Sequence, residues 1–436
     1  MLEQKWKEEI ESDFELYRKS AKKQQEFLNN SSFCSKGDTL EVTYIPKIYS
    51  QKTKQQFEEI ITTTYGIFDK MIHHYLESAS YRAKFGFPKE IEELILVPNG
   101  YDCNLPVARF DIFYHEKDQS FGYCEINADG AGAMNRQVDL NRSLKYNEVY
   151  QKLSQEHQIT FYDPIEHCIN ALLNIYATYK DRKENPGIAI IDFVYEGSSL
   201  VEWEEFAKRF QKRGYQAQVV DIRQLRYENG ILSAPDGMEI DLIYRRAVTT
   251  DIIDHFAEVQ PFIQAVKDQA VCLMGSFRTQ IVHNKMLSVL LGDEETLSLL
   301  TDEERAFVKL HFPYTAPLKE EDLAEYIDTK DRWILKPQDE YCCSGIFVGS
   351  DLTRQEWETA LKTCAKQTYI IQEMYEYEHT PNIDFEEEEP RFGIYINMTG
   401  MYVFGGKFGG IFHRQALGNA IISEVNERSL PTVFID

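Results

Sequence analysis

The sequence lacks the features that define membrane and secreted proteins. It has no apolar run long enough to cross a bilayer, and residues 1–23 are charged, without the apolar segment of a secretory signal. No CxxC motif occurs, and the 8 cysteines are scattered through the chain, a pattern typical of a reduced protein rather than a disulfide framework. We therefore expect a cytoplasmic protein.

Basic residues are also scarce relative to acidic ones. Lys and Arg number 47 against 71 Asp and Glu, which gives a formal net charge of −24. A surface this acidic repels nucleic-acid backbones and anionic membranes, so we expect neither as a partner. With 436 residues, 43% of them apolar, the chain is long enough for two or three packed units.

The stretch between residues 165 and 275 alternates helix and strand patterns. Helices are expected at Val201–Lys212 and Asp251–Asp268. The strand candidates are Gly187–Phe193, Gln216–Ile222, Glu239–Arg245 and Val271–Gly275. This order predicts a mostly parallel α/β layer.

Two predicted strands between residues 108 and 127 carry polar side chains at alternate positions. Alternate residues of a strand share a face, so Arg109 and Asp111 lie together, as do Glu125 and Asn127. If the hairpin turns symmetrically at its midpoint, Asp111 lies opposite Glu125 and Arg109 lies opposite Asn127. The polar groups of the two strands then form one set.

These opposed carboxylates predict a metal site. Directly opposed Cβ atoms lie about 4.5–5.5 Å apart, and two carboxylates that close repel unless a cation or proton lies between them. Asp, Glu and Asn oxygens suit Mg²⁺. The alternative is the solvent-exposed face of an ordinary antiparallel hairpin. The small-residue turn at 128–133 favours a ligand site because it allows close backbone approach, although it has neither the GxGxxG nor the GxxxxGK[ST] spacing.

Two lysines stand where a nucleotide phosphate could be held. Lys285 begins an apolar helix, and Lys336 ends the apolar strand Trp333–Pro337, before a loop at Gln338–Gly345. The strand Tyr369–Tyr375 ends in hydrogen-bond acceptors, and main-chain groups in such an apolar slot can read adenine. Taken alone, each lysine also fits an ordinary surface position, and the strand also fits ordinary burial.

The C-terminal part is predicted to form a hairpin. Its strands are Arg391–Asn397 and Met401–Gly405, with the turn at Met398–Gly400. The acidic run Asp384–Glu389 just before it is expected to be a solvated loop.

In this order the motifs resemble the synthetase domain of glutathionylspermidine synthases and related circularly permuted ATP-grasp ligases. Most ATP-grasp enzymes carry the metal-binding E-x-N motif after the two lysines, whereas here it comes before them. The matching stretches are Arg109-Phe-Asp111, Glu125-Ile-Asn127-Ala-Asp129, His283-Asn284-Lys285, Leu335-Lys336-Pro337, Gln372-Glu373 and Gly405-Gly406 with Arg414. The family loop after Lys-Pro is usually richer in glycine, and this departure leaves the substrate open.

The resemblance implies a mixed α/β fold, namely a circularly permuted ATP-grasp fold with a Rossmann-like pre-ATP-grasp domain. The implied division has four parts. They are N-terminal helices with the metal-binding hairpin (1–160), the pre-ATP-grasp α/β domain (161–278), a small ATP-binding subdomain (279–375) and C-terminal strands that complete the core (376–436).

The resemblance also implies a metal set, a nucleotide set and a catalytic set of residues. They are Asp111, Glu125 and Asn127 for Mg²⁺; Lys285, Lys336, Gln372, Glu373 and Tyr375 for ATP; and Arg109 and Arg414 for the transferred phosphate and the reacting carboxylate. The strand end at Arg245 and Arg246 resembles one that faces the active site in permuted relatives.

The expected activity is ATP-dependent ligation of a carboxylate to an amine through an acyl phosphate, with ADP and phosphate released. The partners would be a small-molecule or peptide carboxylate and an amine co-substrate, whose identities stay open. Two alternatives remain. One is a catalytically silent ATP-binding scaffold or sensor, and the other is a kinase-like enzyme that phosphorylates without ligation.

Overall fold

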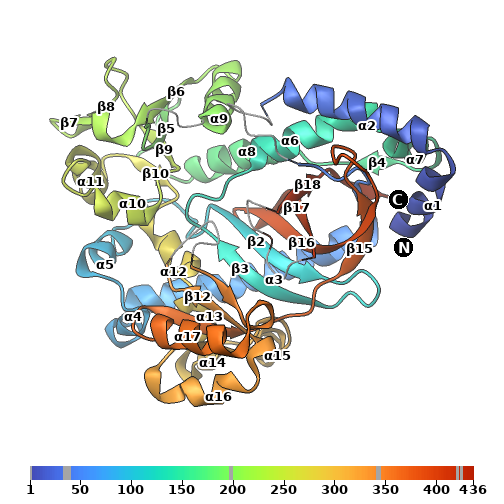
Figure 1. Cartoon of the computed structure of the whole chain (residues 1–436). Coiled ribbons are helices and arrows are strands. Elements are labelled where there is room, and N and C mark those ends of the chain that lie inside the picture. Colours follow the sequence, from blue (N-terminus) through green and yellow to red (C-terminus); the bar gives the residue numbers. More distant parts are fainter. Residues whose placement is uncertain (1, 33–40, 196–199, 340–344, 419–421, 423–425) are drawn as a thin grey trace.

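The computed structural model describes residues 2–32, 41–195, 200–339, 345–418, 422 and 426–436. Its largest sheet is antiparallel, in the order β18-β17-β16-β2-β3, with β15 paired to β16. The strands of this central sheet are β2 (Val107–Tyr114), β3 (Phe121–Asn127), β15 (His379–Ile383), β16 (Phe392–Phe404), β17 (Lys407–Leu417) and β18 (Arg428–Leu430). It lies in the middle of the molecule, between two smaller sheets (Figure 1).

On one face of the central sheet, the apolar side chains of β2 are covered by the long helix α3 (Gln51–Glu77). Phe110 and Ile112 of β2 are fully buried on this side. The ring of Phe68 in α3 lies 5.6 Å from that of Phe110, in an edge-on contact. Because side chains alternate along a strand, Asp111 of β2 points to the other face.

A parallel sheet in the order β10-β9-β5-β6 confirms the predicted α/β layer. Its strands are β5 (Gly187–Asp192), β6 (Gln216–Asp221), β9 (Leu242–Arg245) and β10 (Cys272–Met274). The predicted helix Asp251–Asp268 is wrong, since the segment forms α10 (Thr249–Asp254) and α11 (Gln260–Lys267). Pro261 explains the break, because proline is tolerated in the first turn of a helix but not in its interior.

A small antiparallel sheet in the order β11-β14-β12-β13 lies on the opposite side of the central sheet (Figure 1). Its strands are β11 (Thr315–Pro317), β12 (Trp333–Pro337), β13 (Phe347–Val348) and β14 (Tyr369–Glu373). Helix α17 (Arg354–Cys364) begins with a capping box at Thr353 and packs Trp357, which is fully buried, against the sheet.

The N-terminal and C-terminal parts of the chain meet in a fourth, three-stranded sheet. There β1 (Lys47–Ser50) pairs in parallel with β19 (Thr432–Ile435), which also pairs with β4 (Ile159–Thr160). A short hairpin joins β7 (Arg226–Glu228) to β8 (Ile231–Ser233). No helix within the described ranges is long and apolar enough to span a membrane.

The other α-helices cover these sheets or connect their strands (Figure 1). They are α1 (Leu2–Ser12), α2 (Phe14–Asn29), α4 (Ala79–Phe85), α5 (Lys89–Ile95), α6 (Met134–Ser143), α7 (Glu148–Glu156), α8 (Pro164–Tyr176), α9 (Val201–Lys212), α12 (Gln280–His283), α13 (Met286–Leu290), α14 (Glu294–Leu299), α15 (Asp302–His311) and α16 (Leu323–Ile327).

The predicted turn at Met398–Gly400 is wrong, because β16 runs straight through it. The chain turns instead at Gly405-Gly406, whose φ angles of 55° and 76° lie in the left-handed region that favours glycine. Gly400 sits inside the strand, paired with Asp111. A Cβ atom at Gly400 would lie 2.8 Å from Asp111 Oδ1, so the glycine makes room for the carboxylate.

We predict that Gly400→Ala lowers the free energy of unfolding by about 1–3 kcal/mol, because the new methyl group overlaps the buried Asp111 carboxylate. Gly66→Ala is the control, since Gly66 lies within α3 and an added Cβ meets nothing within 4 Å. It should raise stability by about 0.5–1 kcal/mol through helix propensity. Urea unfolding measures both, and equal effects of the two substitutions would contradict the close approach.

Candidate active site

At its polar residues, the hairpin of β2 and β3 has the pairing expected from the sequence, whereas nearer the turn the symmetric register is wrong. Asp111 pairs with Glu125, and Arg109 pairs with Asn127. The register then shifts by one residue, because Cys124 is the extra residue of a β-bulge. The four polar side chains therefore lie on one face, as predicted, and the bulge sits directly beside them.

Asp111 is fully buried at the centre of this group. Its Oδ1 accepts a hydrogen bond from Arg109 Nε at 2.7 Å, and its Oδ2 accepts from Arg109 Nη2 at 2.9 Å. The same Oδ2 accepts from Arg414 Nη2 of β17 at 2.8 Å and from Asn127 Nδ2 at 3.1 Å. A buried carboxylate is costly unless it is paired and hydrogen-bonded. The two guanidinium groups supply that pairing and are in turn positioned by it.

Arg414 lies between two carboxylates. Besides Asp111, its guanidinium lies 3.7 Å from Glu427, which follows the partly described segment 418–426. Glu427 was not among the predicted site residues. The sequence carries no signal for it, since it lies in no recognisable motif.

Glu125 faces several positive charges. Burial alone would raise the pKa of Glu125, but the charges of Lys285, Lys336 and Arg414 lower it to about 2, with a hydrogen bond from Asn127 Nδ2 to Oε1 at 3.1 Å contributing. The carboxylate is therefore ionised at neutral pH. Side chains from β3, β12, β17 and the start of α13 thus meet at one place.

Lys336 links the small sheet to the central sheet. It is 5% exposed, and its Nζ donates to the carbonyl oxygen of Cys124 at 3.0 Å and to Gln372 Oε1 at 2.8 Å. Gln372 Nε2 donates to Thr315 Oγ1 at 3.0 Å, so the amide is held in one orientation. The hydrogen bond from Lys336 to the carbonyl oxygen at the bulge therefore joins the small sheet directly to the central sheet.

Lys285 stands at the first turn of α13, and its main-chain N–H donates to the carbonyl oxygen of Gln338 at 3.1 Å. This contact joins the start of the helix to the loop after Lys336. The central part of that loop, residues 340–344 with Cys342 and Cys343, lies outside the described residues.

The end of β14 forms one edge of the site. Glu373 pairs with Arg332 at 2.6 Å, so its carboxylate is engaged at the surface. The ring of Tyr375 packs on Gly122, where a Cβ atom would lie 2.2 Å from the ring. Of the predicted nucleotide residues, Gln372 contacts Lys336 directly, whereas the side chains of Glu373 and Tyr375 have other partners.

A pocket lies between the central and small sheets. It is lined by Phe113, Tyr123, Cys124, Glu125, Ile334, Lys336, Ile346, Gln372, Glu373, Met374, Tyr375, Tyr377, Met398, Arg414 and Ile422. Most of these side chains are apolar, and the few polar ones are the residues described above. A mostly apolar pocket with a few convergent polar groups is typical of a nucleotide or other small-molecule site.

Arg245 and Arg246 hold the small-residue turn after β3. Arg245 Nη2 lies 2.7 Å from Asp129 Oδ1, and Arg246 Nη1 donates to the carbonyl oxygen of Ala131 at 2.5 Å. The guanidinium of Arg246 also stacks on Trp203 at 4.2 Å. Both arginines are buried, so they position the turn against the parallel sheet. Two arginines directly after an apolar strand were the available signal for this contact.

Glu125 and Asn127 carry oxygen atoms of the kind that a hard divalent cation prefers, whereas both oxygens of Asp111 already accept hydrogen bonds from Arg109 and Arg414. No group of three or more His, Cys, Asp or Glu side chains in the described part of the chain could hold a metal by itself, so an amide ligand is needed beside the two carboxylates. Asn127 Nδ2 lies 3.1 Å from an oxygen of Asp111 and 3.1 Å from one of Glu125. Rotation of the amide would place its oxygen there. Such an oxygen-only set suits Mg²⁺, which keeps several waters.

No protein-family model matches the sequence, and no curated protein matches it. Among solved structures, a glutathione synthetase-like effector from Globodera pallida is similar over 95% of this chain and 96% of its own, with a TM-score of 0.55 and 11% identity. A protein assigned as a γ-glutamylcysteine synthetase from Methylobacillus flagellatus aligns over 86% and 87%, with a TM-score of 0.36 and 12% identity. D-alanyl-alanine synthetase A from Vibrio cholerae aligns over 58% and 89%, with a TM-score of 0.31 and 10% identity.

The chain has a mixed α/β fold of the ATP-grasp type. This confirms the fold class expected from the sequence. At 11% identity the likeness to the effector concerns the fold alone.

We predict that Glu125 stabilises the fold above pH 4.5 and that this contribution is lost as pH falls from about 4.5 to about 2, because its pKa is lowered in the folded state. The free energy of unfolding of the wild type should exceed that of Glu125→Gln by on the order of 3 kcal/mol more at about pH 6 than under strongly acidic conditions. Denaturant unfolding across this range measures the difference. A difference independent of pH would show that Glu125 does not meet the three cations.

Proposed function

We propose that the protein is an ATP-dependent carboxylate–amine ligase that works through an acyl phosphate. The proposal rests on one observation. Charged and polar side chains of four strands, β3, β12, β14 and β17, line a single pocket between two sheets, within an ATP-grasp-type fold. Lys285 at the start of α13 places its charge near Glu125 of this pocket. The two lysines supply positive charge, and the hairpin supplies oxygen ligands beside them.

ATP would bind with its phosphates at Lys285 and Lys336 and its base at the end of β14, where Gln372, Glu373 and Tyr375 line the pocket. Mg²⁺ would be held by Asp111, Glu125 and Asn127. When bound, it would neutralise charge on the phosphate oxygens, which is what phosphoryl transfer chiefly requires.

In the proposed reaction, an oxygen of the substrate carboxylate attacks the γ-phosphorus of ATP and ADP leaves. The nitrogen of the amine then attacks the acyl carbon, loses a proton, and phosphate departs with the electrons of the broken carbon–oxygen bond. Arg109 would place its charge beside the transferred phosphate while holding Asp111. Arg414 lines the pocket and would stabilise the oxyanion of the tetrahedral intermediate.

The substrates would be a small-molecule or peptide acid and an amine, as the resemblance to glutathionylspermidine synthases implies. The described free cysteines, Cys103, Cys124, Cys168, Cys272 and Cys364, fit a reducing compartment such as the cytoplasm.

The test of this function is a product analysis. The protein is incubated with ATP, Mg²⁺ and a pooled library of acids and amines, and products are identified by mass spectrometry. We expect ADP, phosphate and an amide, with ¹⁸O from the labelled carboxylate appearing in phosphate. AMP with pyrophosphate would mean adenylation. A phosphorylated acid without amide would mean a kinase, and ATP binding without turnover would mean a silent scaffold or sensor. Each of these three outcomes overturns the proposal.

Glu125→Ala should abolish turnover and remain folded.

We predict that Lys336→Met weakens MgATP binding by at least about 30-fold, because the loss of a buried charge partner costs roughly 2 kcal/mol or more. Lys152→Met is the matched control. Lys152 makes a short ion pair, 2.5 Å to Glu9, and it lies on α7 and lines no part of the pocket. Calorimetric titration with MgATP compares the two variants. Unchanged affinity in Lys336→Met would remove Lys336 from the nucleotide site.

A further inference from the structure

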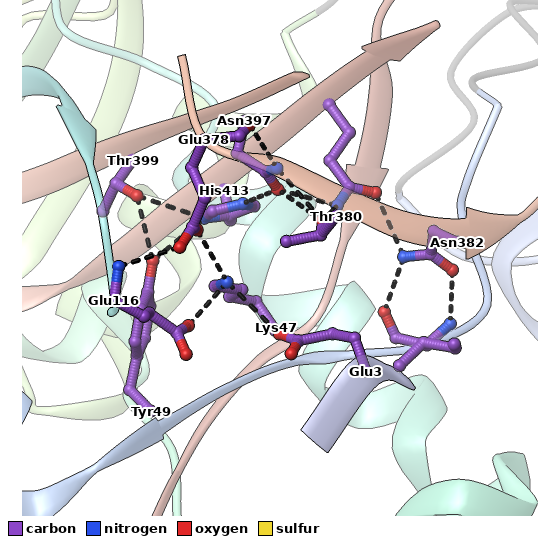
Figure 2. A network of polar contacts seen from close by, with 12 residues as sticks. Glu3, Lys47, Tyr49, Glu116, Glu378, Thr380, Asn382, Asn397, Thr399 and His413 are labelled. Carbon is purple, nitrogen blue, oxygen red and sulfur yellow. Dashed lines mark hydrogen bonds and ion pairs between the residues drawn. The ribbon is translucent and has the colours of Figure 1, made fainter. Parts of the chain in front are cut away.

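Lys47 is a buried lysine of β1 that lies outside the candidate active site. Its Nζ lies 3.2 Å from Glu3, 2.5 Å from Glu116 and 3.2 Å from Glu378, and its side chain is 1% exposed. The three carboxylates come from α1, from the turn between β2 and β3, and from the connection between β14 and β15. Figure 2 shows the ammonium group among them.

The lysine is charged in this setting. Burial alone would lower the pKa of Lys47, but the surrounding carboxylates raise it well above its ordinary value. Burial raises the pKa of Glu116 to about 7. Replacing a buried ion pair by apolar side chains is often neutral or stabilising, so such a cluster is weak evidence for stability. Its geometry points to a role in positioning.

The cluster belongs to a polar network (Figure 2). This network lies on the face of the central sheet opposite Asp111, because Thr399 and His413 alternate with Gly400 and Arg414 along their strands. Tyr49 of β1 bonds to Thr399 at 3.0 Å, and His413 Nε2 lies 3.0 Å from Asn397 Oδ1. His413 precedes Arg414 on β17, and successive residues of a strand point to opposite faces. The network therefore lies on the face of the central sheet opposite Arg414.

Two of the Lys47 partners, Glu116 and Glu378, connect the tip of the β2–β3 hairpin to the segment after β14. Glu378 Oε1 accepts a hydrogen bond from the main-chain N–H of Glu116 at 2.8 Å. Next to it, His115 Nε2 lies 2.9 Å from the carbonyl oxygen of Glu376, and the rings of Phe113 and Tyr377 meet at 4.5 Å. The hairpin tip is thus docked along the segment that follows β14.

We infer that Lys47 is a positioning residue for the base end of the nucleotide site. By binding Glu116 and Glu378 together, it holds the segment after β14 against the tip of the metal hairpin and so sets the spacing between the adenine edge and the phosphate-binding end of the pocket. The inference rests on the proposed function for what the pocket binds. Because the ring of Tyr375 packs closely on Gly122, a small shift of this segment would alter the pocket edge.

The test compares two glutamates of the same cluster. Glu378→Gln removes a carboxylate that joins Lys47 to the segment after β14, whereas Glu3→Gln removes one at the same 3.2 Å distance that touches neither the hairpin nor that segment. Calorimetry gives the Kd of each variant for MgATP and for magnesium tripolyphosphate, which has no base.

We expect Glu378→Gln to weaken MgATP binding by about 10-fold, equivalent to about 1.4 kcal/mol, and to leave tripolyphosphate binding within about twofold. Glu3→Gln should change neither by more than about twofold. Equal weakening by both substitutions, or equal weakening of both ligands in Glu378→Gln, would show a general loss of structure and overturn the inference.

Hydrogen exchange separates this inference from the proposed function. In Glu378→Gln, amides of residues 115–120 and 375–379 should exchange faster than in the wild type, and in Glu3→Gln they should not. A wild-type protein that binds no MgATP would contradict the proposed function. The exchange pattern would still show whether the Lys47 cluster holds the hairpin tip against the segment after β14. Unchanged exchange in Glu378→Gln would show that Lys47 does not hold these segments together.

Discussion

Asp111 accepts hydrogen bonds from Arg109 and Arg414 at the middle of the central sheet, and the other groups of the site are arranged around this buried interaction. The carboxylate needs both guanidinium groups because it is removed from water. In return it aligns Arg414 of β17 with the hairpin, although 303 residues separate them in sequence. Gly400 leaves the space for the carboxylate, and Asn127 joins it to Glu125.

A second constraint joins the two sheets that border the pocket. Lys336 reaches from the small sheet to the carbonyl oxygen of Cys124, which the bulge in β3 presents. The lysine proposed to hold phosphate therefore already contacts the hairpin proposed to hold the metal. On the other side of the central sheet, the Lys47 cluster joins the hairpin tip to the segment after β14. Lys336 and the Lys47 cluster thus fix both ends of the pocket to the hairpin of β2 and β3.

The pairing of Asp111 with Glu125 could be predicted because side-chain alternation and a residue count along the local sequence suffice for it, whereas the bulge at Cys124 could not. The sequence predicts a turn at Gly400 because the reason for a glycine there is the distant Asp111 carboxylate, which no local pattern reveals. The Lys47 cluster was missed for the same reason, since its three carboxylates lie far apart in sequence. The four-part domain division and the roles of the site residues stay predictions.

The central claim is that one site holds both metal and nucleotide at the hairpin. Crystals grown with Mn²⁺ and a non-hydrolysable ATP analogue test it through the anomalous signal of manganese. The account predicts manganese within about 2.5 Å of oxygens of Asp111 or Glu125, bound to the phosphates of an analogue lying between the central and small sheets. Manganese and nucleotide bound at the carboxyl ends of the parallel strands β5 and β9 would contradict it.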